Sequence, residues 1–209
     1  MDFNNILNQV LGAAKEQIAK TANGNETTDK VTKIGGGAAA IGILSMILGR
    51  NGGSNLAKLG SLAALGSMAY QAYQNYQSKQ NQTQTEITPT GFSADETNDT
   101  SKIILQAMIA AAAADGAITS DEAEAIAAEA GNDPELQQWL QQEINQPATV
   151  AEIAQQVGRN QALASQVYLA ARMVCKDLER KEIIFLANLA EALGLNEQFV
   201  EELEKQAGF

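Results

Sequence analysis

The chain lacks several residue types on which common enzymes depend. Histidine is absent from its 209 residues, and Cys175 is the only cysteine. Nucleophilic sites of the Ser/His/Asp and Cys/His kinds need an imidazole, and the usual zinc sites need imidazoles or several thiolates. The sequence therefore excludes these acyl-transfer enzymes and zinc centres, together with an intrachain disulfide framework. Because no cofactor motif is present either, we expect a protein that is not an enzyme.

Long hydrophobic runs are scarce as well. Two apolar segments, Ile34–Leu48 (IGGGAAAIGILSMIL) and Leu59–Tyr70 (LGSLAALGSMAY), are each shorter than the roughly 20 residues with which a helix crosses a bilayer. Lys33 and Arg50 bound the first segment. Each segment could span a membrane only if neighbouring polar residues entered the interface.

Small residues in these segments recur at the spacing that lets helices approach closely, as in Ala63-x-x-x-Ser67. Tyr70, Tyr73 and Tyr76 follow, where interfacial aromatic residues are expected. These features favour a membrane-associated helical hairpin whose Gly-rich helices could also bring copies of the chain together. A soluble Gly-rich hairpin or a flexible tract is the alternative, because repeated glycine lowers helix stability in water.

The first residues of the chain have the spacing of an amphipathic helix. Apolar residues fall on one stripe with the i, i+3, i+4, i+7 pattern, namely Phe3, Leu7, Val10, Leu11, Ala14 and Ile18. The stripe predicts a helix that packs on a partner helix or lies on a membrane surface.

Charge is distributed unevenly along the chain. Residues 1–94 carry seven basic and five acidic side chains, a net +2, and residues 95–209 carry seven and twenty, a net −13. An acidic domain repels phosphate backbones, so we expect no nucleic-acid partner. Cations and basic protein surfaces remain compatible with this charge.

Composition divides the chain into four parts. Residues 1–30 form the amphipathic helix and a connector, and residues 31–78 form the Gly/Ala-rich hydrophobic segment. Residues 79–98 are rich in Gln, Thr, Asn and Ser, which is typical of a linker. Residues 99–209 are expected to form a helical domain.

The last part has helical periodicity and recognisable helix ends. Thr149 with Glu152 is a capping-box pattern, Pro134 suits the first position of a helix, and Gly194 suits a helix end. Three apolar stripes are expected to face a core: Leu136, Trp139, Leu140 and Ile144; Leu163, Val167, Ala170 and Val174; Ile183, Leu186, Ala190 and Leu193. We predict an all-α bundle of short helices, in which Trp139 and Phe185 pack against the core.

A sixty-residue offset relates two stretches of this domain. It pairs Gln106 with Gln166 and Glu122 with Glu182. It also pairs alanines with alanines and branched aliphatic residues with branched aliphatic residues. This similarity indicates two related helical hairpins.

An acidic turn lies in the first hairpin, within AAAADGAITSDEAEAI at residues 111–126. In an EF-hand loop, oxygen ligands come from positions 1, 3, 5, 7, 9 and 12, with glycine at position 6. Asp115, Gly116 and Glu122 would occupy positions 5, 6 and 12, but positions 1 and 3 would fall on Ala111 and Ala113. The turn therefore is half of a site and not a complete EF-hand.

A second acidic contribution could come from the symmetry-related Glu182 and Asp177. The candidate metal ligands are accordingly Asp115, Glu122, Glu182 and Asp177, with calcium or magnesium as the cation. The alternative is structural: Asp115 ends one helix and Glu122 caps the next.

Three stretches carry a family resemblance: residues 60–77 (GSLAALGSMAYQAYQNYQ), residues 111–126, and residues 186–195 (LANLAEALGL). Together they resemble the YebE-type family of bacterial inner-membrane proteins, whose C-terminal part is a TerB-like, tellurite-resistance-type domain. The resemblance implies a TerB-like helical bundle, cytoplasmic and held at the inner membrane by the Gly/Ala-rich segment, with no catalytic activity. It also implies metal binding by Asp115 and Glu122, although Cys175 and Lys176 replace the acid and the glycine in the second hairpin.

Two functions follow as expectations. The first is a non-enzymatic, membrane-associated, stress-related module that binds a protein partner and possesses a weak site for a divalent cation. The second is a soluble, cation-responsive tellurite- or stress-resistance protein that self-associates through its Gly-rich segment.

Overall fold

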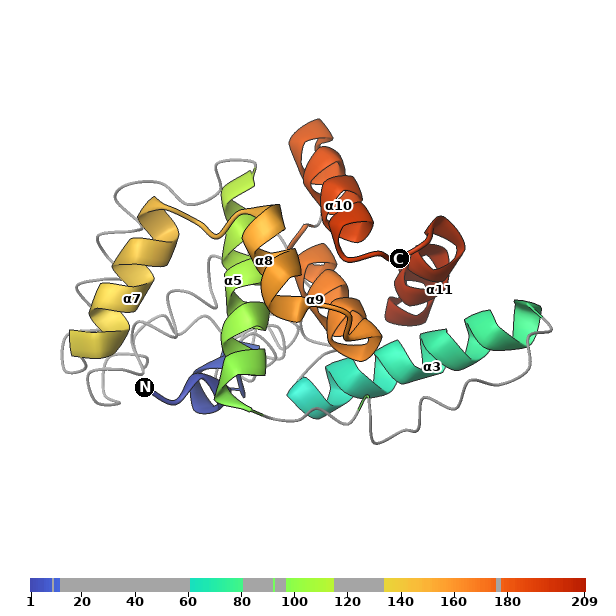
Figure 1. Cartoon of the computed structure of the whole chain (residues 1–209), viewed down its shortest axis with the longest axis horizontal. Helices are drawn as coiled ribbons and strands as arrows, with labels where there is room; N and C mark the ends of the chain where they lie inside the picture. The colour runs from blue at the N-terminus through green and yellow to red at the C-terminus, as the bar shows by residue number, and fades with distance from the viewer. Residues whose placement is uncertain (9, 12–60, 81–91, 93–96, 115–133, 176–177) are drawn as a thin grey trace, which may run out of the picture.

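A computed structural model of the chain describes residues 1–8, 10–11, 61–80, 92, 97–114, 134–175 and 178–209 (Figure 1). These residues form helices and no strand, which confirms the predicted all-α fold. Residues 3–8 and 10–11 are helical, and the longer helices follow in chain order: α3 (Leu62–Gln80), α5 (Asn98–Ala114), α7 (Pro134–Asn145), α8 (Val150–Val157), α9 (Gln161–Val174), α10 (Arg180–Ala192) and α11 (Glu197–Ala207).

The centre of the bundle is the packing of α5 against α9. Every residue from 103 to 112 in α5 and from 162 to 174 in α9 is buried. Helix α5 combines Ile, Leu and Met with many alanines, and α9 combines Leu, Val and Met with several alanines. A helix that is largely apolar all round is buried all round. The other helices pack around this pair.

The two central helices share a buried glutamine at equivalent positions. The Gln106 amide donates to Oε1 of Glu143 on α7, and the Gln166 amide donates to the carbonyl of Phe92 at 3.0 Å. In both glutamines the side-chain oxygen is buried without a hydrogen-bond partner. The offset found in the sequence thus relates residues with the same structural role, which is to hold a peripheral segment on a central helix.

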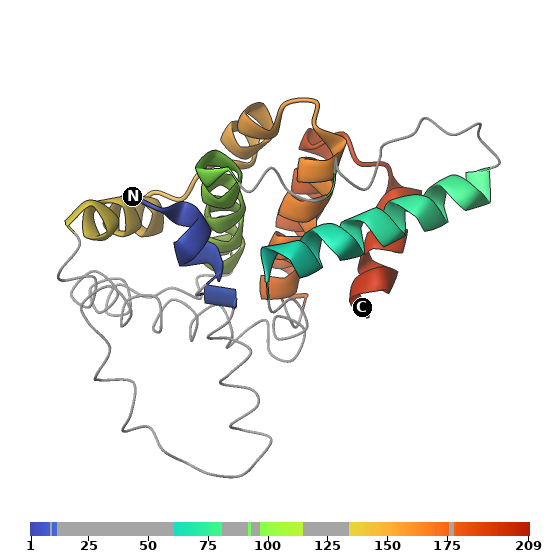
Figure 2. The same cartoon turned by 90° about the horizontal axis from the view of Figure 1, so that it is seen from below.

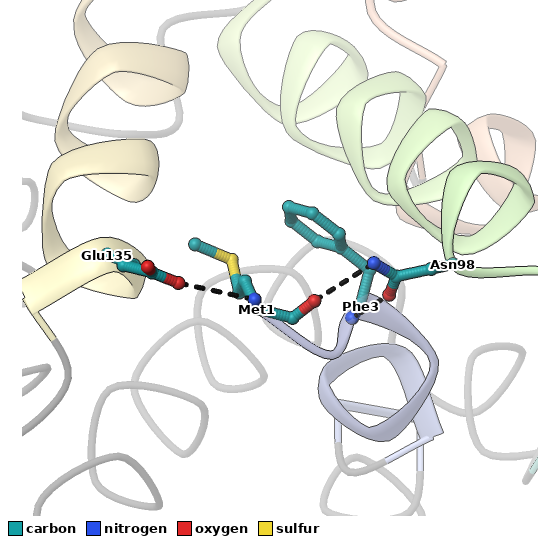
Figure 3. Close-up of polar contacts among 4 residues, drawn as sticks. All are labelled: Met1, Phe3, Asn98 and Glu135. Carbon is teal, nitrogen blue, oxygen red and sulfur yellow. Dashed lines mark hydrogen bonds and ion pairs between the residues drawn. The ribbon is translucent and has the colours of Figure 1, made fainter.

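The beginning of the chain packs between α5 and α7 (Figure 3). The Met1 amino group donates to Glu135 at 3.2 Å, and Asn98 both accepts from the Phe3 amide and donates to the Met1 carbonyl at 2.9 Å. The Phe3 ring meets Trp139 edge-on, with centroids 4.9 Å apart. The predicted apolar stripe is buried at Phe3, Leu7, Val10 and Leu11, which confirms it for the described positions.

Helix α3 packs across α9 and α11 (Figure 2). Its inner face is buried at Leu62, Leu65, Ala69, Ala72 and Tyr73. The Tyr73 ring packs between Phe92 and Phe199, with centroid distances of 5.4 and 6.0 Å. Tyr76 also packs on Phe199 at 5.2 Å. These tyrosines, expected at a membrane interface, therefore contact other aromatic residues of the protein. The buried residues of α3 belong to the same hydrophobic core as those of α5 and α9.

Polar contacts fix α3 in this position. Lys79 forms an ion pair with Glu202 of α11, and the Gln206 amide donates to Gln71 at 2.6 Å. No helix within the described residues combines the length and the hydropathy that a bilayer span requires.

The ends of several helices form as their sequences predict. Thr149 and Glu152 make the capping box of α8, and α7 begins at Pro134. Gly194 follows α10 with a φ of 69°. The hydrogen bonds from Thr149 lower the pKa of Glu152, because they stabilise its charged form.

The backbone of α3 lies close to the backbone of Phe92 at Gly66. A Cβ added there would lie 2.2 Å from the backbone oxygen of Phe92. The small residues that the sequence suggested for close packing, Ala63 and Ser67, are exposed instead. Gly66 is therefore the position at which a small residue is required.

Replacing Gly66 by alanine should have two opposite effects on the free energy of unfolding, one from helix propensity and one from the contact with Phe92. Helix propensity alone would raise the free energy of unfolding by about 1 kcal/mol. The clash with a backbone carbonyl should lower it by about 1 to 3 kcal/mol. We expect net destabilisation in denaturant unfolding of Gly66→Ala, and a change within about 0.5 kcal/mol for the exposed control Ser67→Ala. A stabilised Gly66→Ala protein would contradict the close approach.

A buried arginine joins α9, its C-terminal end and α11. Arg172 is 4% exposed, its Nε donates to Glu204 at 3.0 Å, and its Nη1 donates to the Cys175 carbonyl at 2.7 Å. The guanidinium also lies 3.8 Å from the centroid of the Phe209 ring. The Tyr168 hydroxyl donates to the same Glu204 oxygen at 2.9 Å. Each charge thus has a partner, as buried charges require.

Tyr168 makes stability depend on alkaline pH. Burial, and next the negative charge of Glu204, raise the pKa of Tyr168 far above its ordinary value of 10.0. The contribution of Tyr168 to the free energy of unfolding is therefore fully present below pH 10.0. It is lost as the pH rises above that value, because the tyrosine of the unfolded chain ionises there and the folded one does not. The difference in unfolding free energy between the parent and Tyr168→Phe should therefore shrink as pH rises above about 10. Denaturant titrations at pH 7 to 11 measure this, and a difference that stays constant would refute it.

Candidate functional site

Helix α10 begins with a carboxylate that faces inward. Oε2 of Glu182 accepts a hydrogen bond from the backbone amide of Glu179 at 2.8 Å, which satisfies a donor at the helix start. Glu182 is 3% exposed. The side chain predicted as a metal ligand therefore caps α10, as the structural alternative held for its counterpart Glu122.

The other predicted metal ligands, Asp115, Glu122 and Asp177, lie outside the described residues, so calcium or magnesium binding stays a prediction. Among the residues that the structure does describe, no three acidic or thiol side chains gather in a way that could hold a metal ion. Cys175 is buried at the C-terminal end of α9, where its carbonyl accepts from Arg172.

Two isoleucines lie on the side of α10 opposite Glu182. The buried arc of α10 contains Glu182, Leu186, Leu189 and Ala190 and packs on α8, α5 and α9. Ile183 and Ile184 are 51% and 50% exposed. The prediction that Ile183 would lie on the buried stripe was therefore wrong, whereas Leu186, Ala190 and Leu193 are buried as expected.

The outward side of α10 forms one continuous stripe. It consists of exposed residues spaced three or four apart along the helix, and we call it the α10 face: Arg180, Ile183, Ile184, Ala187, Asn188 and Glu191. Lys181 and Ala192 are exposed as well and lie beside one edge of this face. Figure 1 shows α10 at the margin of the bundle. The face has a basic residue at one end, aliphatic side chains in the middle and an acidic residue at the other end.

Two properties of the α10 face are unfavourable for an isolated bundle. Adjacent large aliphatic side chains leave apolar surface in water, and such surfaces mark interaction sites more often than scattered single residues do. Arg180 and Lys181 also lie in the first turn, where the helix dipole disfavours positive charge. Residues that lower the stability of the isolated fold, as these do, are expected at functional sites.

Sequence reasoning missed this surface because it assigned Ile183 to the core. The signal available was the pair of neighbouring isoleucines, since two adjacent residues lie about 100° apart on a helix and a narrow buried stripe holds both poorly. Phe185, predicted to pack against the core, is partly buried and does so.

The described helices and this surface define an all-α protein in which one helix, α10, has an exposed face with two isoleucines. Comparison with known families places residues 33–207 in the family described as "Protein of unknown function (DUF533)". The match covers most of the chain, so the chain belongs to that family. No curated protein matches the chain, and no solved structure matches it either.

If the α10 face serves binding, its isoleucines contribute little to folding. We expect Ile184→Ser to change the unfolding free energy by no more than about 0.5 kcal/mol, because the side chain is half exposed. Leu186→Ala on the buried side of the same helix should cost about 2 to 5 kcal/mol. Thermal and denaturant unfolding of the two variants measure the contrast, and an equal loss would show that Ile184 is a core residue.

Proposed function

We propose that this protein is a non-enzymatic, membrane-associated module of bacteria that binds a protein partner through the α10 face. Its helical bundle is TerB-like and lies on the cytoplasmic side of the inner membrane. The role fits a stress response of the kind that the resemblance to YebE-type proteins implies.

The exposure of Ile183 and Ile184 carries this proposal. Two aliphatic side chains, each half exposed, lie next to each other on a regular helix whose opposite side is packed in the core. Burying them against a partner would contribute roughly 25 cal/mol for each Å² removed from water. Charged groups flank them at both ends, which is the arrangement of an apolar interface centre with a polar rim.

Membrane association draws its support from the sequence. The segment Ile34–Leu48 has no charged residue, and its glycines and alanines suit packing between helices in lipid. The bundle would then be held close to the membrane, and a partner at the same surface would meet it at a raised effective concentration.

A photo-crosslinking amino acid placed at position 184 tests the binding role in cells that produce the full chain. We expect irradiation to join the chain to a protein at position 184. No product is expected at Gln155, an exposed residue of α8 that serves as the matched control. The absence of any protein product at position 184 would refute the binding role.

Fractionation of the same cells tests the membrane role. We expect the chain in the membrane pellet after a wash at high salt, because apolar insertion resists screening whereas surface charge attraction does not. Recovery in the supernatant would contradict membrane association. It would favour the soluble, cation-responsive protein that self-associates through its Gly-rich segment.

A further inference from the structure

We infer that the partner of the α10 face is the α10 face of a second copy of this chain, packed antiparallel about a two-fold axis. The inference rests on the proposed binding role of this face and adds the identity and the orientation of the partner.

The order of residues along α10 makes the face complementary to itself. In an antiparallel pair with its axis midway between residues 185 and 186, position 180 faces position 191 of the other copy, and position 184 faces position 187. Arg180 then meets Glu191 twice, once at each end of the pair, and Ile184 meets Ala187 twice at the centre. A two-fold interface requires this reciprocity, since each residue must suit the residue that it meets on an identical surface.

Side-chain size supports the same arrangement. Ala187 leaves a shallow place on the helix surface into which Ile184 of the other copy can pack, and helices meet at 8 to 10 Å when small residues lie at the contact. Ile183 and Asn188 lie at opposite edges of the face, because each is about 70° from the line through Arg180, Ile184, Ala187 and Glu191.

Charge selects a second copy in this orientation. Residues 95–209 carry a net −13, so two bundles repel each other unless opposite charges meet locally. The parallel arrangement would place Arg180 beside Arg180 and Glu191 beside Glu191. The antiparallel arrangement turns both like-charge contacts into opposite-charge contacts.

The size of the surface predicts a weak dimer. One helix face gives less than the roughly 800 Å² per partner of a standard stable interface. The dimer should therefore dissociate on dilution in solution and form more readily where the chain is concentrated at a membrane.

Sedimentation velocity of the purified full chain over a range of concentrations tests the arrangement. We expect a monomer and dimer in equilibrium for the parent. The single variants Arg180→Glu and Glu191→Arg should each raise the dimer dissociation constant roughly tenfold or more, because both ion pairs become like-charge contacts. The double variant Arg180→Glu with Glu191→Arg should restore the parent value, because the pairs are re-formed with reversed sign.

Rescue in the double variant separates this interface from self-association through the Gly-rich segment, which none of these substitutions touches. Thermal unfolding of each variant checks that the exposed substitutions leave the bundle folded. A parent that is monomeric throughout, single variants that dimerise like the parent, or a double variant that fails to recover would each overturn the inference.

Crosslinking at position 184 separates the inference from the proposed function. A product with twice the mass of the chain supports both. A product with a different protein retains the binding role and overturns the second-copy assignment, and a product with phospholipid overturns both.

Discussion

The buried guanidinium of Arg172 is the interaction on which the arrangement of the C-terminal helices depends. It is 4% exposed and its contacts join three separate parts of the chain: the end of α9 through the Cys175 carbonyl, α11 through Glu204, and the last residue through the Phe209 ring. A buried positive charge is tolerated only while such partners remain in place. These contacts hold the C-terminal end of α9 and helix α11 together, and α10 lies between these two helices in the chain.

The burial of Leu186, Leu189 and Ala190 against the bundle decides which residues of α10 lie outward. Glu182, which accepts from the amide of Glu179, lies on the same inward side, and Ile183 and Ile184 lie toward solvent. The exposure of two isoleucines thus accompanies the burial of the capping carboxylate. A helix turned the other way would bury them and expose the capping carboxylate. The α10 face is therefore exposed because the opposite side of the helix is packed, and not because the helix packs loosely.

Much of the fold could be predicted from the sequence, because its signals are local. The cap at Thr149, the proline that begins α7 and the stripe from Phe3 to Leu11 depend on neighbours in the chain. The orientation of α10 could not be predicted, since periodicity places isoleucine inside and glutamate outside. Gly66 could not be recognised either, because its neighbour is the backbone of Phe92, 26 residues away in the sequence. Three of the four predicted metal ligands, Asp115, Glu122 and Asp177, lie outside the described residues, so cation binding by them stays a prediction.

The tyrosines of α3 illustrate how one pattern serves two environments. Aromatic rings that follow a small-residue apolar segment suit a membrane interface, where one end of the ring is dry and the other wet. In the structure the Tyr73 ring packs against Phe92 and Phe199, and the Tyr76 ring packs against Phe199. The Tyr76 hydroxyl accepts a hydrogen bond from the Asn196 amide at 2.5 Å. The position of these two tyrosines is therefore explained by contacts within the protein.

Charge placement on α10 restricts the partners that its face can accept. A uniformly acidic face would repel a second acidic bundle, and a uniformly basic one would attract such a bundle in many orientations. Arg180 and Glu191 are 11 residues apart, about 16 Å along the helix axis, which exceeds the Debye length of about 8 Å at physiological ionic strength. The two ends are therefore screened from each other and act as separate contacts, each of which must meet its own opposite charge. Only a partner with the same spacing and the reverse direction satisfies both at once, and an identical helix running antiparallel is such a partner.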